Sequence, residues 1–317
     1  MRVLVTGANG FIGRATCAAF RDRHFLVRAA VRQAKKLAIG GAHEIIGVGN
    51  VGPDTDWREA LIDVDMVVHL AARVHVMRDS SRDPLAEFRL TNRAGTVKLA
   101  MAAVEAGVRR MVFVSSIKVN GEATPIDQPF SETSVPQPQD PYAVSKWEAE
   151  QALIEIAGAT SLEVVILRPA LVYGPGVAGN FIRMLKAVRR NVPLPFASVE
   201  NRRSYIYVAN LVDAIGLCLT QTSASGNTYL VSDGENVSTP ELLLRLGKAV
   251  GTPVRLLPVP EKALRMFGRL LRKTDELDRL TGSLVVDSSR IRRELSWCPR
   301  FSMADGLQAT ANWFGQL

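Results

Sequence analysis

Apolar and polar positions alternate in blocks along the first half of the chain. Short apolar runs lie at residues 2–6, 26–31, 44–48, 66–70, 110–115 and 163–168. Longer stretches with a helical pattern fill most of the gaps, at residues 11–22, 85–106 and 142–157. Strand-like runs that alternate with helical stretches are typical of a parallel sheet with crossover helices. The pattern therefore predicts an α/β fold with a doubly wound parallel sheet.

The pattern changes in the second half of the chain. Proline and glycine become more frequent after Pro169, and the strict alternation stops from Tyr173 onward. We therefore predict that residues 1–172 form the sheet domain. Residues 173–317 should form mainly a smaller second domain, with the chain returning to the first around residues 204–222.

A glycine-rich turn joins the first predicted strand to the first predicted helix. Gly7, Gly10 and Gly13 are spaced three apart. Glycine lets the backbone turn sharply and approach a pyrophosphate, to which a helix N-terminus offers free N–H groups and a positive dipole end. The turn predicts a dinucleotide site, although the spacing differs from G-x-G-x-x-G. The alternative is a glycine turn that binds nothing.

A tyrosine and a lysine stand four residues apart at the start of a predicted helix, in the stretch PYAVSKWEAEQ (141–151). Residues four apart share one helix face, so Tyr142 and Lys146 can act at one point. A neighbouring ammonium lowers the pKa of a phenol from its usual value of ~10. The pair therefore predicts a proton-transfer device. Coincidence on a solvated helix is the alternative.

Composition excludes several other classes of protein. The net charge is +8, but aromatic residues make up only 6% of the chain and no Lys/Arg run exceeds two residues, which argues against nucleic-acid binding. No apolar run reaches the ~18 residues of a membrane span. The N-terminus has no signal-peptide layout. The basic amphipathic pattern at residues 263–273 is expected to pack on the protein core rather than on a membrane.

Cysteine and histidine usage predicts neither a disulfide framework nor a metal site. Cys17, Cys218 and Cys298 are few and scattered. The four histidines, His69 and His75 among them, show no metal-ligand spacing, and these two are expected to have structural roles. Together these features predict a cytoplasmic protein.

With both motifs present, the chain resembles the extended short-chain dehydrogenase/reductase family, in particular its nucleotide-sugar epimerases and ketosugar reductases. The resemblance covers nearly the whole chain and implies a Rossmann domain followed by a smaller C-terminal substrate domain. The matching segments are TGANGFIG (6–13), HLAA (69–72), TNRAGT (91–96), VSSIKVNGE (114–122), PYAVSK (141–146), RPALVYGPG (168–176) and RRSYIYV (202–208).

The resemblance implies catalytic roles for three residues. Tyr142 would be the acid/base, and Lys146 would lower its pKa and bind the nicotinamide ribose. Ser116 would orient the reacting oxygen, with Ser115 as its alternate because of the SS pair. The cofactor-binding residues implied in the same way are Gly7, Gly10, Phe11, Ile12, Gly13, Asn50, Val51, Leu70, Ala71, Ala72, Asn92 and Lys146.

The end of the second strand bears on which cofactor is bound. Relatives that use NAD carry an acidic residue there, which binds the ribose hydroxyls. This chain has no acid between Arg28 and Lys36, and Arg32 follows Val31. A guanidinium suits a 2′-phosphate, so we expect NADP, with NAD as the alternative.

On the substrate side, the resemblance implies a nucleotide sugar, UDP-linked by preference. A diphosphate calls for arginine and amide donors, and Asn180 and Arg203 match family positions near it. Arg279 would add a third contact. The alternative for each is a free surface residue. Leu171 stands where epimerase relatives often have asparagine, which puts the sugar contact there in doubt.

Three functions fit these residues. The preferred one is NAD(P)H-dependent reduction of a UDP-4-keto-6-deoxy amino sugar, as in the C4-reductase branch that serves bacterial surface polysaccharides such as O-antigen. The alternative is a UDP-hexose or UDP-N-acetylhexosamine 4-epimerase. A non-enzymatic dinucleotide sensor is the remote third. The resemblance also implies a homodimer formed through the helices at 85–106 and 142–157.

Overall fold

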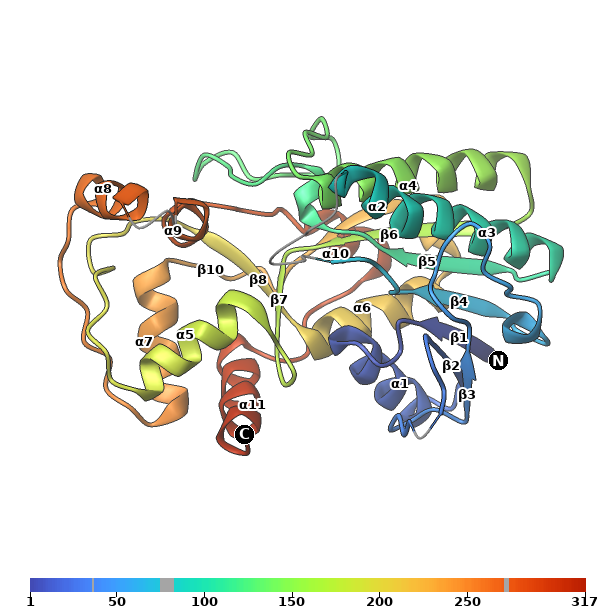
Figure 1. Ribbon diagram of the computed structural model, residues 1–317, viewed down its shortest axis with the longest axis horizontal. Helices are drawn as coiled ribbons and strands as arrows, with labels where there is room; N and C mark the ends of the chain where they lie inside the picture. Colours follow the sequence, from blue (N-terminus) through green and yellow to red (C-terminus); the bar gives the residue numbers. More distant parts are fainter. Residues whose placement is uncertain (36, 75–82, 271–273) are drawn as a thin grey trace.

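The computed structural model describes residues 1–35, 37–74, 83–270 and 274–317. His75 therefore lies outside the described residues, as do the last three positions of the amphipathic pattern at 263–273 and Lys36 after the second strand. Figure 1 shows a large sheet with helices on both faces, and a second group of elements beyond one edge of it.

A seven-stranded parallel sheet forms the larger part of the molecule. Its strand order is β3-β2-β1-β4-β5-β6-β9, and every neighbouring pair is parallel. This is the Rossmann order with one strand added at the edge. The six predicted strands are confirmed, and β9 was not predicted. The strands are β1 (Arg2–Thr6), β2 (Leu26–Val31), β3 (Glu44–Gly47), β4 (Met66–His69), β5 (Arg110–Val114), β6 (Glu163–Pro169) and β9 (Thr228–Val231).

Two layers of helices cover this sheet, one on each face (Figure 1). Side chains alternate across a strand, so Val3 and Val5 pack with the α1 and α6 side, whereas Leu4 packs with the α3 and α4 side. Both layers are therefore anchored by the same short strands. The helices of the first layer are α1 (Phe11–Asp22) and α6 (Val208–Thr220); those of the second are α2 (Pro84–Arg89), α3 (Gly95–Glu105) and α4 (Pro141–Ala159).

The helix predicted at 85–106 differs from a single α-helix. A π-helical segment, η2 (Leu90–Ala94), separates α2 from α3. It contains Asn92, which is 1% exposed and whose side chain bonds outside the helix to Arg73 and Ser145. Such π segments are frequent at functional sites, and no feature of the apolar pattern distinguishes one from an α-helix.

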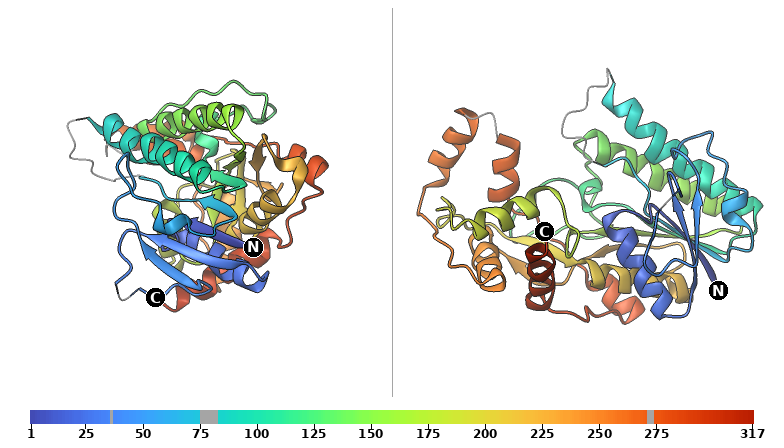
Figure 2. Two further views of the ribbon diagram at one scale, coloured as in Figure 1. Left: turned by 90° about the vertical axis from the view of Figure 1, so that its right-hand side faces the viewer. Right: turned by 60° about the horizontal axis from the view of Figure 1, so that its bottom comes forward.

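The second group of elements surrounds a small sheet of order β10-β8-β7. Figure 2 shows α8 and α9 at the end of the molecule away from the N-terminus. The predicted division at residue 172 stays a prediction. The chain crosses between the two sheets more than once, because α6 packs on the large sheet, β9 is one of its strands and α10 contacts β9. The elements around the small sheet are β7 (Leu171–Tyr173), α5 (Gly179–Arg189), β8 (Arg203–Tyr207), β10 (Asn236–Val237), α7 (Thr239–Val250), α8 (Glu261–Leu270), α9 (Thr274–Thr281) and α11 (Met303–Gly315), and α10 spans Ser289–Leu295.

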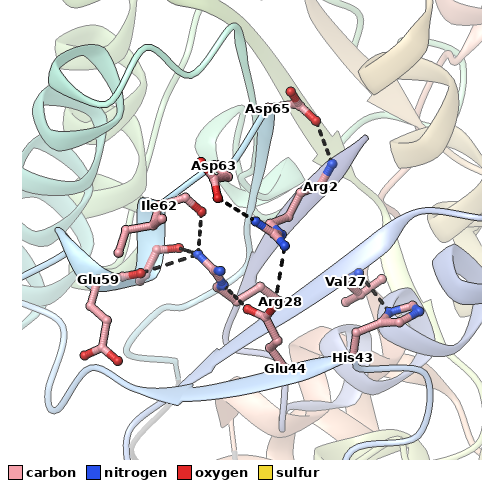
Figure 3. A network of polar contacts seen from close by, with 10 residues as sticks. Arg2, Val27, Arg28, His43, Glu44, Glu59, Ile62, Asp63 and Asp65 are labelled. Atoms are coloured by element: carbon pink, nitrogen blue, oxygen red, sulfur yellow. Dashed lines mark hydrogen bonds and ion pairs between the residues drawn. The ribbon is translucent and has the colours of Figure 1, made fainter.

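A polar network lies at the amino-terminal ends of the first strands (Figure 3). Arg28 in β2 is 8% exposed; its Nε donates to Glu44 Oε2 at 2.5 Å, and its Nη1 donates to the carbonyl oxygens of Ala60 and Ile62. Arg2 pairs with Asp63 at 3.3 Å. The network satisfies a buried guanidinium at the opposite end of the strands from the glycine turn. Arg28 therefore has a structural role.

Two negative findings concern only the part of the chain that the structure describes. None of its helices combines the length and apolar composition that a membrane crossing requires. Its histidine, cysteine and acidic side chains form no cluster of three or more that could hold a metal ion.

Candidate active site

The glycine turn is closely packed against two stretches of backbone. Gly7 has φ +63°, and a Cβ added there would lie 2.8 Å from the Ala71 nitrogen. A Cβ on Gly13 would lie 2.2 Å from the Gly7 oxygen. Gly10 caps α1 without a side chain, and the first turn, which holds Phe11 and Ile12, has no acidic residue. Its free N–H groups therefore suit an anion, and the residues present fit a dinucleotide pyrophosphate.

A buried histidine holds the turn after β4 against the glycine turn. His69 contacts Thr6 Oγ1 through Nδ1 at 2.7 Å and Thr96 Oγ1 through Nε2 at 2.9 Å. Thr6 Oγ1 also accepts hydrogen bonds from the Leu70 and Ala71 nitrogens. Burial lowers the pKa of His69 to about 3, and the Lys146 charge adds to this effect. The ring is therefore neutral, and its role is structural. Leu70, Ala71 and Ala72 are half-buried beside it.

The η2 segment connects this edge to α4. Asn92 accepts a hydrogen bond from the Arg73 nitrogen and donates to the Ser145 hydroxyl at 2.9 Å. A Cβ on Gly95 would lie 2.7 Å from Val51 Cγ1, so α3 packs directly on Val51. Thr6, Thr96 and Ser145 were not predicted, because a lone hydroxyl side chain carries no sequence signal.

Two predicted cofactor residues lie at the outer edge of this region. Arg32 is exposed immediately after β2, and its carbonyl accepts a hydrogen bond from the Gly49 nitrogen. Its guanidinium makes no ion pair with a described residue. Asn50 is also exposed, and its carbonyl accepts a hydrogen bond from the Thr55 hydroxyl. Both side chains remain open to a ligand.

The fold brings the three predicted catalytic residues together. Ser116 follows β5 and caps a short 3-10 turn, η3 (Ile117–Val119). Tyr142 lies in the first turn of α4, half-buried, and forms a side-chain hydrogen bond with Ser116. Lys146 is one turn further along and 2% exposed. Ser115, the alternate, has a buried hydroxyl without a partner among the described residues. The Ser116–Tyr142 contact favours Ser116.

The expected lowering of the Tyr142 pKa is wrong for the protein chain by itself. Burial raises the pKa of Tyr142 to about 12, Asp140 raises it further, and the Ser116 hydrogen bond lowers it. Lys146 does not contribute, because its Nζ donates to the Val114 oxygen at 2.8 Å and lies 3.8 Å from the Phe113 ring centroid. Burial also lowers the pKa of Lys146 to about 7, against the attraction of Glu150.

A buried ion pair supports α4 behind Lys146. Glu150 and Arg168 are 0% and 4% exposed. Arg168 Nη2 lies 2.5 Å from Glu150 Oε2, and its Nη1 donates to Asn120 Oδ1 at 3.0 Å. Separating the two partners would leave an uncompensated buried charge, which is costly, so the contact holds them together. The pair therefore fixes β6 and the segment after Ser116 against the helix that carries Tyr142.

The predicted substrate residues lie around the small sheet. Asn180, in the first turn of α5, lines a pocket of about 210 Å³ whose wall includes Phe196, Leu243 and Leu280. Arg203 in β8 is 5% exposed, and its Nη1 donates to the Gly282 oxygen at 2.7 Å. Its Nε is buried and makes no hydrogen bond to a described residue. The exposed Arg279 is close enough to lower the Arg203 pKa, in addition to the larger effect of burial.

Backbone contacts connect the catalytic segment to Arg203. Thr124, a few residues after Ser116, donates from its nitrogen to the Ser283 oxygen. Leu284, the next residue, pairs with Arg203 in a β-bridge. Leu171 is half-buried in β7 and packs on a small apolar cluster that contains Leu284. The two sets of predicted residues thus lie on one connected framework.

Comparison with known proteins agrees with this arrangement. Over 316 aligned residues the chain is 42% identical to a UDP-glucose 4-epimerase of Vibrio cholerae, a match that covers 99% of this chain and 95% of the relative. The structure of a Thermus thermophilus UDP-glucose 4-epimerase with NAD is similar with a TM-score of 0.79 and 26% identity, over 99% of both chains. MoeE5, solved with UDP-glucuronic acid and NAD, is similar with a TM-score of 0.80 and 26% identity, over 100% of this chain and 99% of that one.

The family assignment rests on most of the chain. Residues 3–232 match the family described as "NAD dependent epimerase/dehydratase family". These residues include the glycine turn, His69, Asn92 and the Ser116–Tyr142–Lys146 group. The protein is therefore an enzyme of the NAD dependent epimerase/dehydratase family, within the short-chain dehydrogenase/reductase superfamily.

Proposed function

We propose that the protein is a 4-epimerase of a UDP-hexose or UDP-N-acetylhexosamine, which acts through a transient 4-ketone. The observation that carries this proposal is the hydrogen bond between Ser116 and Tyr142 beside the buried Lys146. The preference for an epimerase over the reductase expected from the sequence is supported by the 42% identity to a UDP-glucose 4-epimerase along 99% of the chain.

The dinucleotide would be held by the glycine turn, by the turn at Leu70–Ala72 and by Lys146. When bound, the dinucleotide would supply the hydride chemistry at C4 of the sugar. The Tyr142 phenolate takes the proton from the C4 hydroxyl during oxidation, and the hydroxyl so formed returns it to the C4 oxygen during reduction. The Ser116 hydroxyl hydrogen-bonds the same oxygen and orients it. Lys146 favours the phenolate form when its Nζ is protonated and turns toward the tyrosine side of the site.

The raised pKa of Tyr142 determines which form of the phenol predominates at neutral pH. With a pKa of about 12 the phenol is protonated and ready to donate. The oxidising half needs the phenolate, so its rate should increase as the pH rises toward that value. Any group that lowers the Tyr142 pKa therefore accelerates the oxidising half.

The sugar nucleotide would lie against the small sheet. Arg203 and Arg279 supply two cationic groups for the diphosphate, and charged hydrogen bonds to phosphate are the strong ones. Asn180 adds an amide to the wall of the pocket that Phe196 and Leu243 also line. Leu280, the residue after Arg279, belongs to the same wall, so we expect this apolar pocket to receive a base joined to a diphosphate.

A second candidate is the NADPH-dependent 4-ketosugar reductase, including one that makes a 6-deoxy amino sugar for surface polysaccharide. The observation that favours it is Arg32, exposed at the end of β2 with no acidic residue following the strand and no described ion-pair partner. A net reductase draws on NADPH, and Arg32 suits its 2′-phosphate. A dinucleotide sensor has no use for the Ser116–Tyr142 contact.

One experiment separates these candidates. Purified protein is denatured to identify and count the released dinucleotide, and fresh protein is incubated with NAD and UDP-glucose or UDP-N-acetylglucosamine while NMR follows the C4 epimer. The epimerase proposal expects retained NAD and conversion to the galacto product. NADPH consumption with a UDP-4-ketosugar and no epimer would select the reductase. Binding of dinucleotide with neither activity would leave only the sensor.

We also propose a homodimer formed through α2, α3 and α4. Apolar side chains are exposed on this face: Leu90 on η2, Met101 on α3 and Ile154 on α4. Light scattering should give twice the chain mass of 34.6 kDa. The substitution Ile154→Arg should yield the monomer, whereas a parent protein that is already monomeric would contradict the proposal.

A further inference from the structure

A compact cluster of charges lies beside the catalytic residues and has no part in the proposed mechanism. Lys118 Nζ is 2.5 Å from Asp140 Oδ2 and 2.8 Å from Glu122 Oε1. The side chains of Lys118, Asp140 and Glu122 are 17%, 23% and 34% exposed, so the contacts are largely shielded from solvent. One ammonium therefore bridges two carboxylates.

Each end of the Lys118–Asp140 bridge is fixed to a turn that carries a catalytic residue. On one side, the Lys118 nitrogen donates to Ser116 Oγ at 3.3 Å, within the turn that Ser116 caps. On the other, Asp140 caps α4, with Oδ1 accepting from the Ala143 nitrogen at 2.7 Å. Tyr142 lies between the cap and Ala143. The bridge thus ties the turn that carries Ser116 to the helix turn that carries Tyr142.

The same bridge controls the charge near the phenol. Tyr142 faces Asp140 from the cap of its own helix, Ser116 from the cap of η3, and the edge of the Phe88 ring from α2, over which Arg73 lies at 5.5 Å. Asp140 raises the Tyr142 pKa. Lys118 lies directly on that carboxylate, so its removal would take a cation away from the carboxylate beside the phenol.

We propose that Lys118 is a positioning residue for the proposed C4 chemistry: its bridge to Asp140 holds the Ser116 hydroxyl and the Tyr142 phenol at one reacting oxygen and balances the carboxylate beside that phenol. This inference rests on the proposed function. The segment after Ser116 would then also connect the turn that carries Ser116 to the turn that carries Tyr142.

The test compares Lys118→Met with Lys118→Arg and with a matched control. Arg245 also bridges two carboxylates, Glu235 and Glu241, each at 2.6 Å, but on α7. Arg245→Met therefore removes an equivalent charge far from Ser116 and Tyr142. Turnover is followed with UDP-glucose and NAD from pH 6 to 10. Independently of turnover, difluorotyrosine is incorporated at position 142, and its phenol is titrated by fluorine NMR.

In Lys118→Met we expect the phenol titration, and with it the pH profile of kcat, to move up by about one pH unit, which is about tenfold less phenolate and about tenfold lower kcat at a fixed pH. The KM for UDP-glucose should change little. Lys118→Arg should restore kcat to within about threefold. Adding Asp140→Asn, which keeps a capping oxygen, should move both profiles back down.

Two results would overturn the proposal. One is a Lys118→Met protein whose phenol titration matches that of Arg245→Met, since a merely structural bridge lowers activity without moving the phenol pKa. The other is an Asp140→Asn protein whose phenol titrates as in the parent, and this variant serves if Lys118→Met does not fold. If UDP-glucose is not turned over, the proposed function is at fault, and the NMR titration still decides the role of Lys118.

Discussion

The proposed dinucleotide site and the proposed sugar-nucleotide site are built in different ways. The first is made largely of backbone: Gly7 and Gly13 leave no room for a Cβ because other main-chain atoms lie 2.2–2.8 Å from where it would stand. The second is made of side chains, with Asn180, Arg203 and Arg279 projecting from α5, β8 and α9.

This difference has a consequence for specificity. A backbone site binds the same phosphate geometry whatever side chains surround it, and it fails when the turn is altered. A side-chain site can exchange one donor for another without a change of fold. We therefore expect a variant on the dinucleotide side to change only dinucleotide affinity, and a variant on the sugar-nucleotide side to change only sugar-nucleotide affinity. A variant of Tyr142 should change the rate of the chemistry and neither affinity.

The largest effect is expected for Tyr142→Phe. Loss of a positioned acid/base should lower kcat by at least ~10²-fold, while the affinities for NAD and for UDP-glucose change little. Stopped-flow turnover and calorimetric titration measure the two quantities. A pure variant that retains turnover would remove Tyr142 from the mechanism, and a variant that loses either binding event would break the separation between the two sides.

Arg203→Met should affect only the sugar-nucleotide side. A hydrogen bond to a charged partner is worth about 1.5–3 kcal/mol, so the KM for UDP-glucose should rise by about 10- to 100-fold, with NAD affinity unchanged. The neighbouring Arg202→Met is the control, since that side chain is 49% exposed and pairs with Glu241 at 3.5 Å. Equal effects of the two variants would show that Arg203 does not contact the substrate.

Acid should destabilise the dinucleotide side through His69. Unfolded, this histidine gains a proton below about pH 6.5, whereas in the folded protein it does so only near pH 3. The contribution of His69 to the free energy of unfolding is therefore fully present above about pH 6.5. It decreases as the pH falls, by about 2 kcal/mol at pH 5. Urea unfolding at pH 7 and pH 5 measures it. In His69→Gln the free energy of unfolding should decrease less between pH 7 and pH 5 than in the parent. An equal decrease in both proteins would show that His69 is charged in the folded protein.

The smallest effect is expected for Arg32→Ala. Because the guanidinium is exposed, its contact with a 2′-phosphate should be worth about tenfold in NADPH affinity, at the weaker end for charged hydrogen bonds. NADH has no such phosphate and should bind as before. Paired titrations of NADPH and NADH on parent and variant test this. Equal changes for both, or none, would make Arg32 an ordinary surface charge and remove the support for NADP and for the reductase.

The sequence by itself determined the six principal strands, the glycine turn and the Tyr142/Lys146 pair. These features are local: apolar runs of strand length, glycines three apart and residues four apart on one helix face all lie within a few positions of each other. The same locality explains why η2 and β9 were missed. A π segment has the apolar pattern of a helix, and β9 is a short strand whose place in the sheet depends on its contact with β6.

Only the tertiary structure decided which groups surround the reacting phenol and with what effect. The spacing of Tyr142 and Lys146 predicted a lowered phenol pKa, but burial raises it, and Lys146 bonds to Val114 instead. The Lys118–Asp140 bridge and the contact of Arg203 with Gly282 likewise join residues far apart in the chain. Burial and the direction of a charged side chain arise from long-range packing, because they depend on neighbours that local sequence patterns do not specify.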